Sequence, residues 1–192
     1  MVEGLPIGRA KEFGIVCRMR SLTLYATLLI SLSQAYAFDS KTWMHKSCKI
    51  HVVMGARETS SIGSLLITVA APTGKRATVR ADRDGEMVGA WAADLDSDGK
   101  FEVIVATRSA GGGNYGRAIV YSWTGQMLKK RIVPELNQSQ IKGHFGKDQF
   151  SVSRNSLIRS YPTFVQKAND PPRKTGNRTL ILNLKKFRWE SI

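Results

Sequence analysis

Residues 87–132 read MVGAWAADLDSDGKFEVIVATRSAGGGNYGRAIVYSWTGQMLKKRI, and this stretch decides the fold. It contains four short runs rich in valine, isoleucine, leucine and aromatic residues: Met87–Ala93, Phe101–Thr107, Arg117–Trp123 and Gln126–Ile132. Asp98-Gly99 and Thr124-Gly125 lie between runs and are typical of tight turns. In the third run, Ile119, Tyr121 and Trp123 would share one face of a strand. The stretch therefore predicts consecutive strands joined by turns.

The same pattern continues on both sides of this stretch. Further runs of this kind are Lys49–Met54, Ser64–Ala70, Arg76–Arg80, Gln149–Ser153, Leu157–Phe164 and Thr179–Leu184. Only Pro134–Lys142 is expected to be helical. Many short strands separated by turns are typical of sandwiches and barrels. We predict an all-β fold, an antiparallel β-sandwich with a short connecting helix.

The first 37 residues have the pattern of an export signal. Leu22–Leu32 is an apolar run of 11 residues, which is shorter than the roughly 20 that a membrane-spanning helix needs. Arg18 and Arg20 precede the run and Ala35-Tyr36-Ala37 follows it, as in a cleavable signal peptide. Because Met19 directly precedes this pattern, we expect translation to start there. Residues 38–192 are predicted to form a single β domain with no membrane span.

The chain is strongly basic. Its 192 residues include 29 Lys and Arg against 15 Asp and Glu, a formal net charge of +14. Such a charge favours an anionic partner, and export argues against nucleic acid as that partner. The two cysteines exclude a disulfide-stapled scaffold. Cleavage of the signal would leave Cys48 alone, either buried or paired between chains in a homodimer.

An acidic segment lies between the first two runs quoted above. Calcium takes six to eight oxygen ligands, and alternate carboxylates with a glycine at the sixth place are typical of calcium loops. The acid at the twelfth place of an EF-hand is missing, and strands rather than helices flank the segment. Two interpretations stay open, a hairpin turn with Asp98-Gly99 at its apex or a calcium site. The candidate calcium ligands are Asp94, Asp96, Asp98 and Glu102.

A glycine-rich segment, Arg108-Ser109-Ala110-Gly111-Gly112-Gly113-Asn114-Tyr115-Gly116, follows the second run. It contains a formal G-x-G-x-x-G match, but it leads into another strand, whereas a dinucleotide fingerprint opens a helix. We therefore discard a cofactor site. Glycines allow close approach to a partner, and a tyrosine supplies contact area and a hydroxyl. The segment is either a binding loop or a flexible connection with Tyr115 folded back on the sheet.

Two weaker features complete the list of candidate sites. His45, Cys48 and His51 are residue types that bind zinc, but in a strand Cys48 would point away from the two histidines, which favours core or surface roles. Residues 154–192 hold nine basic and two acidic residues, which indicates a solvated strand face, a steering patch or a polyanion-binding region. No set of residues typical of nucleophilic or acid–base catalysis stands out, and we predict that the protein is not an enzyme.

Several motifs occur in an order that resembles a known family. They are Ser61-Ile62-Gly63-Ser64, Arg83-Asp84-Gly85, the stretch from Ala93-Asp94 through Glu102-Val103-Ile104-Val105 to Gly111, Gly143–Phe150, Leu157–Pro162 and Thr175–Arg178. Together they resemble the periplasmic inhibitors of invertebrate-type (i-type) lysozyme of Gram-negative bacteria. The resemblance implies a small antiparallel β-sandwich, exported to the periplasm, with a protruding Ser-Gly-x-Tyr loop that enters the lysozyme cleft.

This motif maps onto Gly112-Gly113-Asn114-Tyr115, with glycine at position 112 where the family has serine. The implied partner is lysozyme of the i-type, and no cofactor is expected unless the acidic segment binds calcium. Arg108 and Arg117 would pair with cleft carboxylates if they point outward. The alternative function is a calcium-binding extracytoplasmic β module with a structural or adhesive role. The expected lysozyme-binding residues are Arg108, Ser109, Gly111, Gly112, Gly113, Asn114 and Tyr115.

Overall fold

The computed structural model describes residues 1, 39–59 and 61–192. The expected signal peptide, with its start at Met19, falls almost entirely on residues outside this set. The chain separates into two units, Met1–Ser33 and Gln34–Ile192, and every described strand belongs to the second. No helix in the described part of the chain is both long and apolar enough to cross a membrane.

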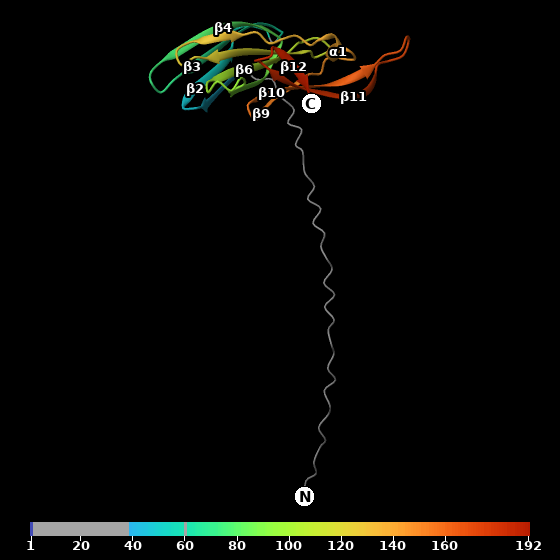
Figure 1. Cartoon of the computed structure of the whole chain (residues 1–192), viewed down its shortest axis with the longest axis horizontal. Helices are drawn as coiled ribbons and strands as arrows, with labels where there is room; N and C mark the ends of the chain where they lie inside the picture. Colours follow the sequence, from blue (N-terminus) through green and yellow to red (C-terminus); the bar gives the residue numbers. More distant parts are fainter. Residues whose placement is uncertain (2–38, 60) are drawn as a thin grey trace. The chain divides into compact units, whose positions relative to one another are not determined.

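The described residues form twelve strands and one short helix (Figure 1). All described strand pairs are antiparallel, which confirms the predicted all-β antiparallel fold. The elements are β1 (Ser40–His45), β2 (Cys48–Met54), β3 (Ile62–Ala70), β4 (Arg76–Asp84), β5 (Glu86–Ala93), β6 (Phe101–Arg108), β7 (Gly116–Trp123), β8 (Leu128–Arg131), α1 (Gln138–Ile141), β9 (Gln149–Ser153), β10 (Ser156–Val165), β11 (Arg173–Asn183) and β12 (Arg188–Ser191).

The strands form three four-stranded sheets in chain order: β1–β4, β5–β8 and β9–β12. Strands that follow each other within a sheet are hydrogen-bonded neighbours, as short hairpin connections require. In Figure 1 the hairpin of β10 and β11 (orange) extends beyond the neighbouring strands. Each sheet is therefore a meander, and the three meanders follow one another along the chain.

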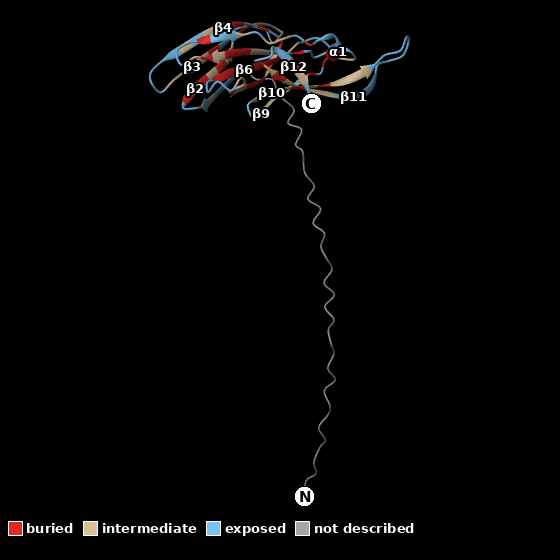
Figure 2. Ribbon diagram, viewed as in Figure 1, coloured by how far each residue is buried: buried red, intermediate tan, exposed pale blue. Residues whose placement is uncertain are grey.

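The middle sheet is covered on both faces, and β6 shows why. Phe101, Val103 and Val105 of β6 belong to the hydrophobic core shared with the first sheet. Ile104 points the other way, into the core shared with the third sheet. A strand buried on both sides needs a continuous apolar run rather than an alternating one, and residues 101–107 are all buried (Figure 2). The sandwich thus has three layers.

The structure differs from the sequence prediction mainly at the edges of sheets. The predicted strands omit β1 and β12, which are the outer strands of the first and third sheets. An outer strand pairs on one side only and carries more polar residues, so its sequence pattern is weak. The helix α1 lies inside the predicted Pro134–Lys142 segment and begins at a capping box formed by Asn137 and Gln140.

Gly85 marks the point where the chain passes from the first sheet to the second. Its φ of +96° is a conformation that L side chains rarely adopt, and a Cβ there would overlap the carbonyl group of Arg108. The buried Arg83 donates to the carbonyl oxygens of Gly85 and Thr59, the latter at 2.6 Å. The Arg83-Asp84-Gly85 motif therefore fixes the backbone beside the end of β6, where the glycine-rich loop begins.

Candidate functional site

The glycine-rich segment forms the connection between β6 and β7, and it is closed by its own hydrogen bonds. The amide of Ser109 donates to the carbonyl oxygen of Tyr115 at 2.9 Å, and the amide of Tyr115 donates to Ser109 Oγ at 3.0 Å. At the tip, the amide of Asn114 donates to the carbonyl oxygen of Gly111 at 2.9 Å. We call residues 109–115 the inhibitory loop, after the role that the family resemblance implies for them.

Tyr115 is half-exposed in this loop. Its relative exposure is 47%, and its ring packs edge-on against the ring of His144 with 5.3 Å between centroids. A Cβ at position 113 would overlap the Tyr115 ring, which explains the glycine there. Ala110, Gly111, Gly112 and Asn114 are exposed as well. The loop thus presents bare backbone and one aromatic side chain to the solvent.

A second loop, residues 143–148, supports the inhibitory loop from one side. The amide of Lys147 donates to the carbonyl oxygens of Gly113 at 2.8 Å and of Asn114 at 3.1 Å. Gly146 has a φ of +80°, and a Cβ there would overlap the carbonyl oxygen of Gly113. Glycine at position 146 therefore permits this close approach of the two backbones.

The Asp148 carboxylate holds the base of the inhibitory loop, and its side chain is fully buried. Its Oδ2 accepts from the amide of Gly116 at 2.8 Å, and its Oδ1 accepts from Arg159 Nε at 2.7 Å. The Nε2 atom of His144 lies 3.1 Å from both oxygens. Burial acts to raise the pKa of Asp148, but the hydrogen bonds from His144, Arg159 and Gly116 outweigh it and hold the pKa below its ordinary value.

His144, Asp148 and Arg159 are the site residues that the sequence prediction did not assign. They occur in the Gly143–Phe150 and Leu157–Pro162 segments of the family resemblance, but no spacing links them to the loop. Gly116 and Asp148 are 32 residues apart. Only the packing of the third sheet against the second brings them together.

The two arginines at the base of the loop already have partners within the chain. Arg108 pairs with Glu86 at 3.1 Å, and Arg117 pairs with Asp84 at 3.8 Å. Binding of either guanidinium to a lysozyme carboxylate would require exchange of these partners. The hydroxyl of Ser109 accepts the Tyr115 amide and so maintains the shape of the loop.

The acidic segment forms a turn and also gathers three carboxylates. Asp94 accepts from the amides of Asp98 and Gly99, both at 3.0 Å, as in the hairpin interpretation. One oxygen each of Asp94, Asp96 and Glu102 lies within 4.8 Å of the others. Asp98 is not in this group, and its Oδ1 accepts from the amide of Lys100 at 2.8 Å.

Two further features affect how well this group of carboxylates suits a cation. Arg131 lies 3.2 Å from Asp96 Oδ2, while none of the described residues donates a hydrogen bond to the buried Oδ1 of Asp96. Glu102 is buried, and this burial raises its pKa although Ser122 and the amide of Leu95 donate to it. The group therefore combines ligand-type oxygens with an arginine that already balances part of their charge.

The histidines and the cysteine of the weak zinc pattern lie in a hairpin rather than in one strand. His45 ends β1 and Cys48 begins β2, with Lys46 and Ser47 at positive φ between them. Cys48 is a free thiol in the core between the first and second sheets, and His45 packs edge-on against Phe101. In the part of the chain that the structure describes, these residues do not form a group of metal ligands.

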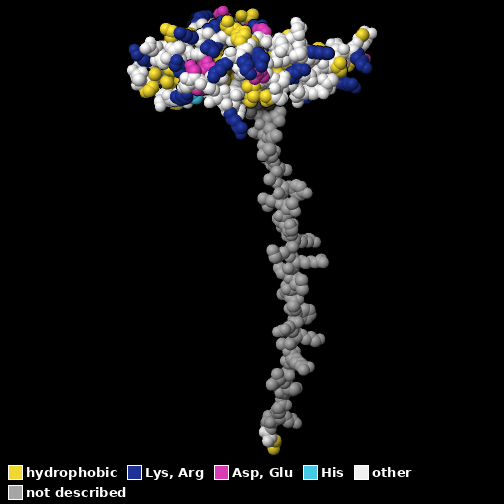
Figure 3. All heavy atoms as spheres, viewed as in Figure 1, with side chains coloured by type: hydrophobic (Ala, Val, Ile, Leu, Met, Phe, Trp, Pro, Cys, Tyr) yellow, Lys and Arg dark blue, Asp and Glu magenta, His cyan; other side chains and the backbone are white. Residues whose placement is uncertain are grey.

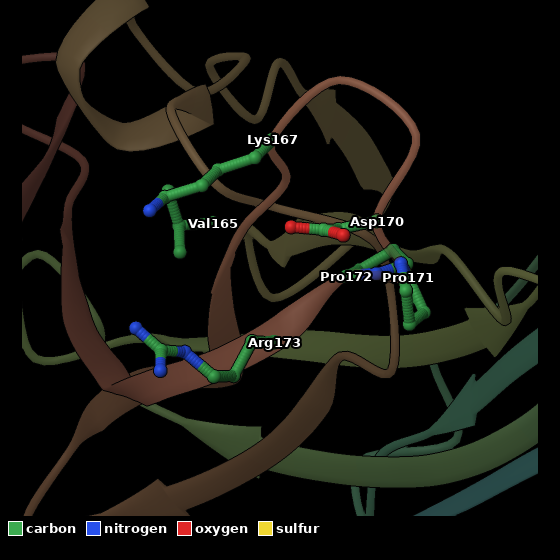
Figure 4. A pocket seen from close by; sticks show the side chains of 6 residues that line it. All are labelled: Val165, Lys167, Asp170, Pro171, Pro172 and Arg173. Carbon is green, nitrogen blue, oxygen red and sulfur yellow. The ribbon is translucent and has the colours of Figure 1, made fainter.

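Basic side chains are spread over the visible face of the domain rather than gathered in one patch (Figure 3). A hollow of about 390 Å³ lies at the tip of the β10–β11 hairpin, and its lining residues do not include the predicted site residues. Figure 4 shows Lys167 and Arg173 on opposite sides of it, with Asp170 between them. The polyanion-binding interpretation of residues 154–192 stays a prediction.

The model of the family described as periplasmic lysozyme inhibitor of I-type lysozyme matches residues 41–143, more than half of the chain. The chain belongs to this family. The match includes the first two sheets and the whole inhibitory loop, and it ends before His144. The third sheet, with the Gly143–Phe150 segment that supports the loop, lies almost entirely beyond it.

One solved structure is similar to the chain: the crystal structure of PliI-Ah, the periplasmic lysozyme inhibitor of I-type lysozyme from Aeromonas hydrophyla. The two sequences are 25% identical, the alignment covers 47% of this chain and 83% of that one, and the TM-score is 0.43. Comparison with curated proteins gives no match.

The buried carboxylate gives a testable prediction. Replacing Asp148 with Asn leaves Arg159 buried without its charged partner, and loss of one member of a buried pair costs roughly 3–5 kcal/mol in the free energy of unfolding. The pKa of Asp148 lies below the roughly 3.9 of an unfolded chain. The contribution of the Asp148 carboxylate to the free energy of unfolding is thus fully present above the pKa of the unfolded chain. It is lost as the pH falls through the pKa of the folded state.

Denaturant unfolding of wild type and Asp148→Asn between pH 2 and 7 measures both effects. The variant should be less stable at neutral pH and should lose less stability on acidification. The exposed Asp170→Asn is the matched control, with a change within about 0.5 kcal/mol. Equal stability of wild type and Asp148→Asn at pH 7 would contradict the role of this carboxylate.

Proposed function

We propose that this chain inhibits an i-type lysozyme by placing the inhibitory loop in the active-site cleft of the enzyme. The observation that carries the proposal is the half-exposed Tyr115 on a loop held by its own hydrogen bonds and by Lys147. A loop that is ordered before binding loses less conformational entropy on association. The family, an inhibitor family, supports the same conclusion, and the chain would act by binding rather than by catalysis.

The active-site cleft of a lysozyme suits the narrow shape of the inhibitory loop. A glycosidase uses two carboxylates that flank the scissile bond in a sugar-binding cleft. A narrow loop with exposed backbone can enter such a cleft, and a Cβ at Gly111 or Gly112 would meet no atom within 4 Å. Tyrosine adds rigid contact area and a hydroxyl. We further propose that residues 1–37 are a cleavable signal that exports the protein to the periplasm, where the family acts.

Tyr115 should be the main contact of the loop. Tyr115→Ala is expected to raise the inhibition constant for an i-type lysozyme by roughly 30-fold or more, which corresponds to the 2 kcal/mol threshold of a binding hot spot. Tyr115→Phe keeps the ring beside His144 and isolates the contribution of the hydroxyl. Lysis of bacterial cell walls with purified 38–192 measures both variants. An unchanged constant for a folded Tyr115→Ala would remove the loop from the mechanism.

Position 112 offers a gain-of-function test. A side chain there meets open space and the φ is not positive, so serine is accepted without strain. Gly112→Ser restores the serine that the family resemblance implies and should tighten inhibition by roughly 2- to 12-fold, the range of one hydrogen bond. Gly112→Ala is the matched control, since it adds a Cβ without a hydroxyl. Equal inhibition by the serine and alanine variants would show that this hydroxyl makes no contact.

Calcium binding is the second candidate function, because Asp94, Asp96 and Glu102 bring three carboxylates together and Asp96 Oδ1 lacks a partner among the described residues. It predicts that calcium raises the melting temperature of wild type and of Asp98→Asn, and that Asp96→Asn removes the shift. Calorimetric titration gives the heat of binding directly. Weak extracellular calcium sites bind in the millimolar range. If millimolar calcium gives neither heat nor a shift in melting temperature, calcium binding is rejected.

A further inference from the structure

An exposed aromatic cluster lies beside the inhibitory loop. Phe145 is 38% exposed, and its ring packs edge-on against Phe164 with 5.7 Å between centroids. The Nζ atom of Lys147 lies 5.9 Å from the Phe164 ring. Aromatic side chains are enriched in protein interfaces. We call Phe145, Lys147 and Phe164 the Phe145 surface.

The backbone attaches this surface to the inhibitory loop. Lys147 donates its amide to the loop, and the amide of Phe164 donates to the carbonyl oxygen of Gly143 at 2.9 Å. His144 forms an isolated bridge with Thr163, next to a β-bulge between Thr163 and Phe164. Bulges redirect a side chain within a strand. The bulge therefore places Phe164 beside the segment that supports the loop.

The size of the inhibitory loop indicates that it needs a neighbouring contact. Specific protein complexes bury about 800 Å² on each partner and involve roughly 20–30 residues per side. The loop has only seven residues, some of which face the protein. Among the exposed large apolar residues of the described chain, Met127 and Phe187 lie in turns at the far ends of β7 and β11. The Phe145 surface adjoins the loop through the amide of Lys147.

We propose that the Phe145 surface is a second contact with i-type lysozyme, packing on the protein surface beside the cleft while the inhibitory loop enters it. This inference rests on the proposed function. All three residues lie after residue 143, where the family match ends. The 143–148 segment and the third sheet would thus contribute a contact in addition to the loop that lies within the matched region.

Phe145→Ala tests this surface. The variant should raise the inhibition constant roughly tenfold, as expected for an interface aromatic, with an unchanged melting temperature because the side chain is partly in solvent. Phe187→Ala is the matched control: it removes an exposed phenylalanine at the opposite end of the third sheet and should inhibit like wild type. Lys147→Glu, which reverses the exposed charge over the Phe164 ring and keeps the backbone amide that donates to the loop, should also weaken inhibition.

The outcomes separate this inference from the proposed function. If Tyr115→Ala weakens inhibition while Phe145→Ala and Lys147→Glu behave like Phe187→Ala, the second contact is wrong and the loop mechanism stands. If the wild-type chain inhibits no i-type lysozyme, both proposals fail. If Phe145→Ala lowers the melting temperature, Lys147→Glu decides, because its side chain is exposed and belongs to neither core.

Discussion

The buried Asp148 carboxylate is the interaction on which the candidate site depends. It accepts hydrogen bonds from Gly116 of β7, from Arg159 of β10 and from His144, whose ring contacts Tyr115. A buried charge is tolerated only when such partners surround it. The same four groups therefore join the second sheet to the third and set the position of the inhibitory loop. A change at Asp148 would therefore alter both the stability of the fold and the position of the inhibitory loop.

The middle sheet links this site to the rest of the fold. Because β6 has cores on both faces, the inhibitory loop follows directly from a strand whose first seven residues are buried. Gly85 touches the end of this strand from the first sheet, and Gly146 touches the loop from the other side. The flanking glycines allow backbone-to-backbone packing that no larger residue permits. The loop is thus held at its base and open only at its tip.

Much of this architecture is predictable from the sequence. The parts that are not predictable depend on interactions that a local sequence pattern does not contain. The central strands follow from apolar runs such as Phe101–Thr107, and the loop follows from its glycines and Tyr115. The outer strands β1 and β12 have too few apolar residues to be recognised. The support from Asp148 and Arg159 depends on contacts between distant segments, which local patterns do not encode. In the acidic segment, alternate carboxylates in the sequence indicate Asp94, Asp96, Asp98 and Glu102 as candidate ligands, and the fold brings three of them together while Asp98 lies outside the group.

The open tip of the loop has a consequence for how the protein can change over evolutionary time. Side chains added at Gly111 or Gly112 would meet no other atom, whereas Gly85, Gly113 and Gly146 are each required by a close contact. Side chains can therefore be added at the tip without a steric clash, and each one alters the surface that a binding partner meets. Such a division between a tolerant tip and a constrained base lets the contact surface vary while the scaffold stays the same.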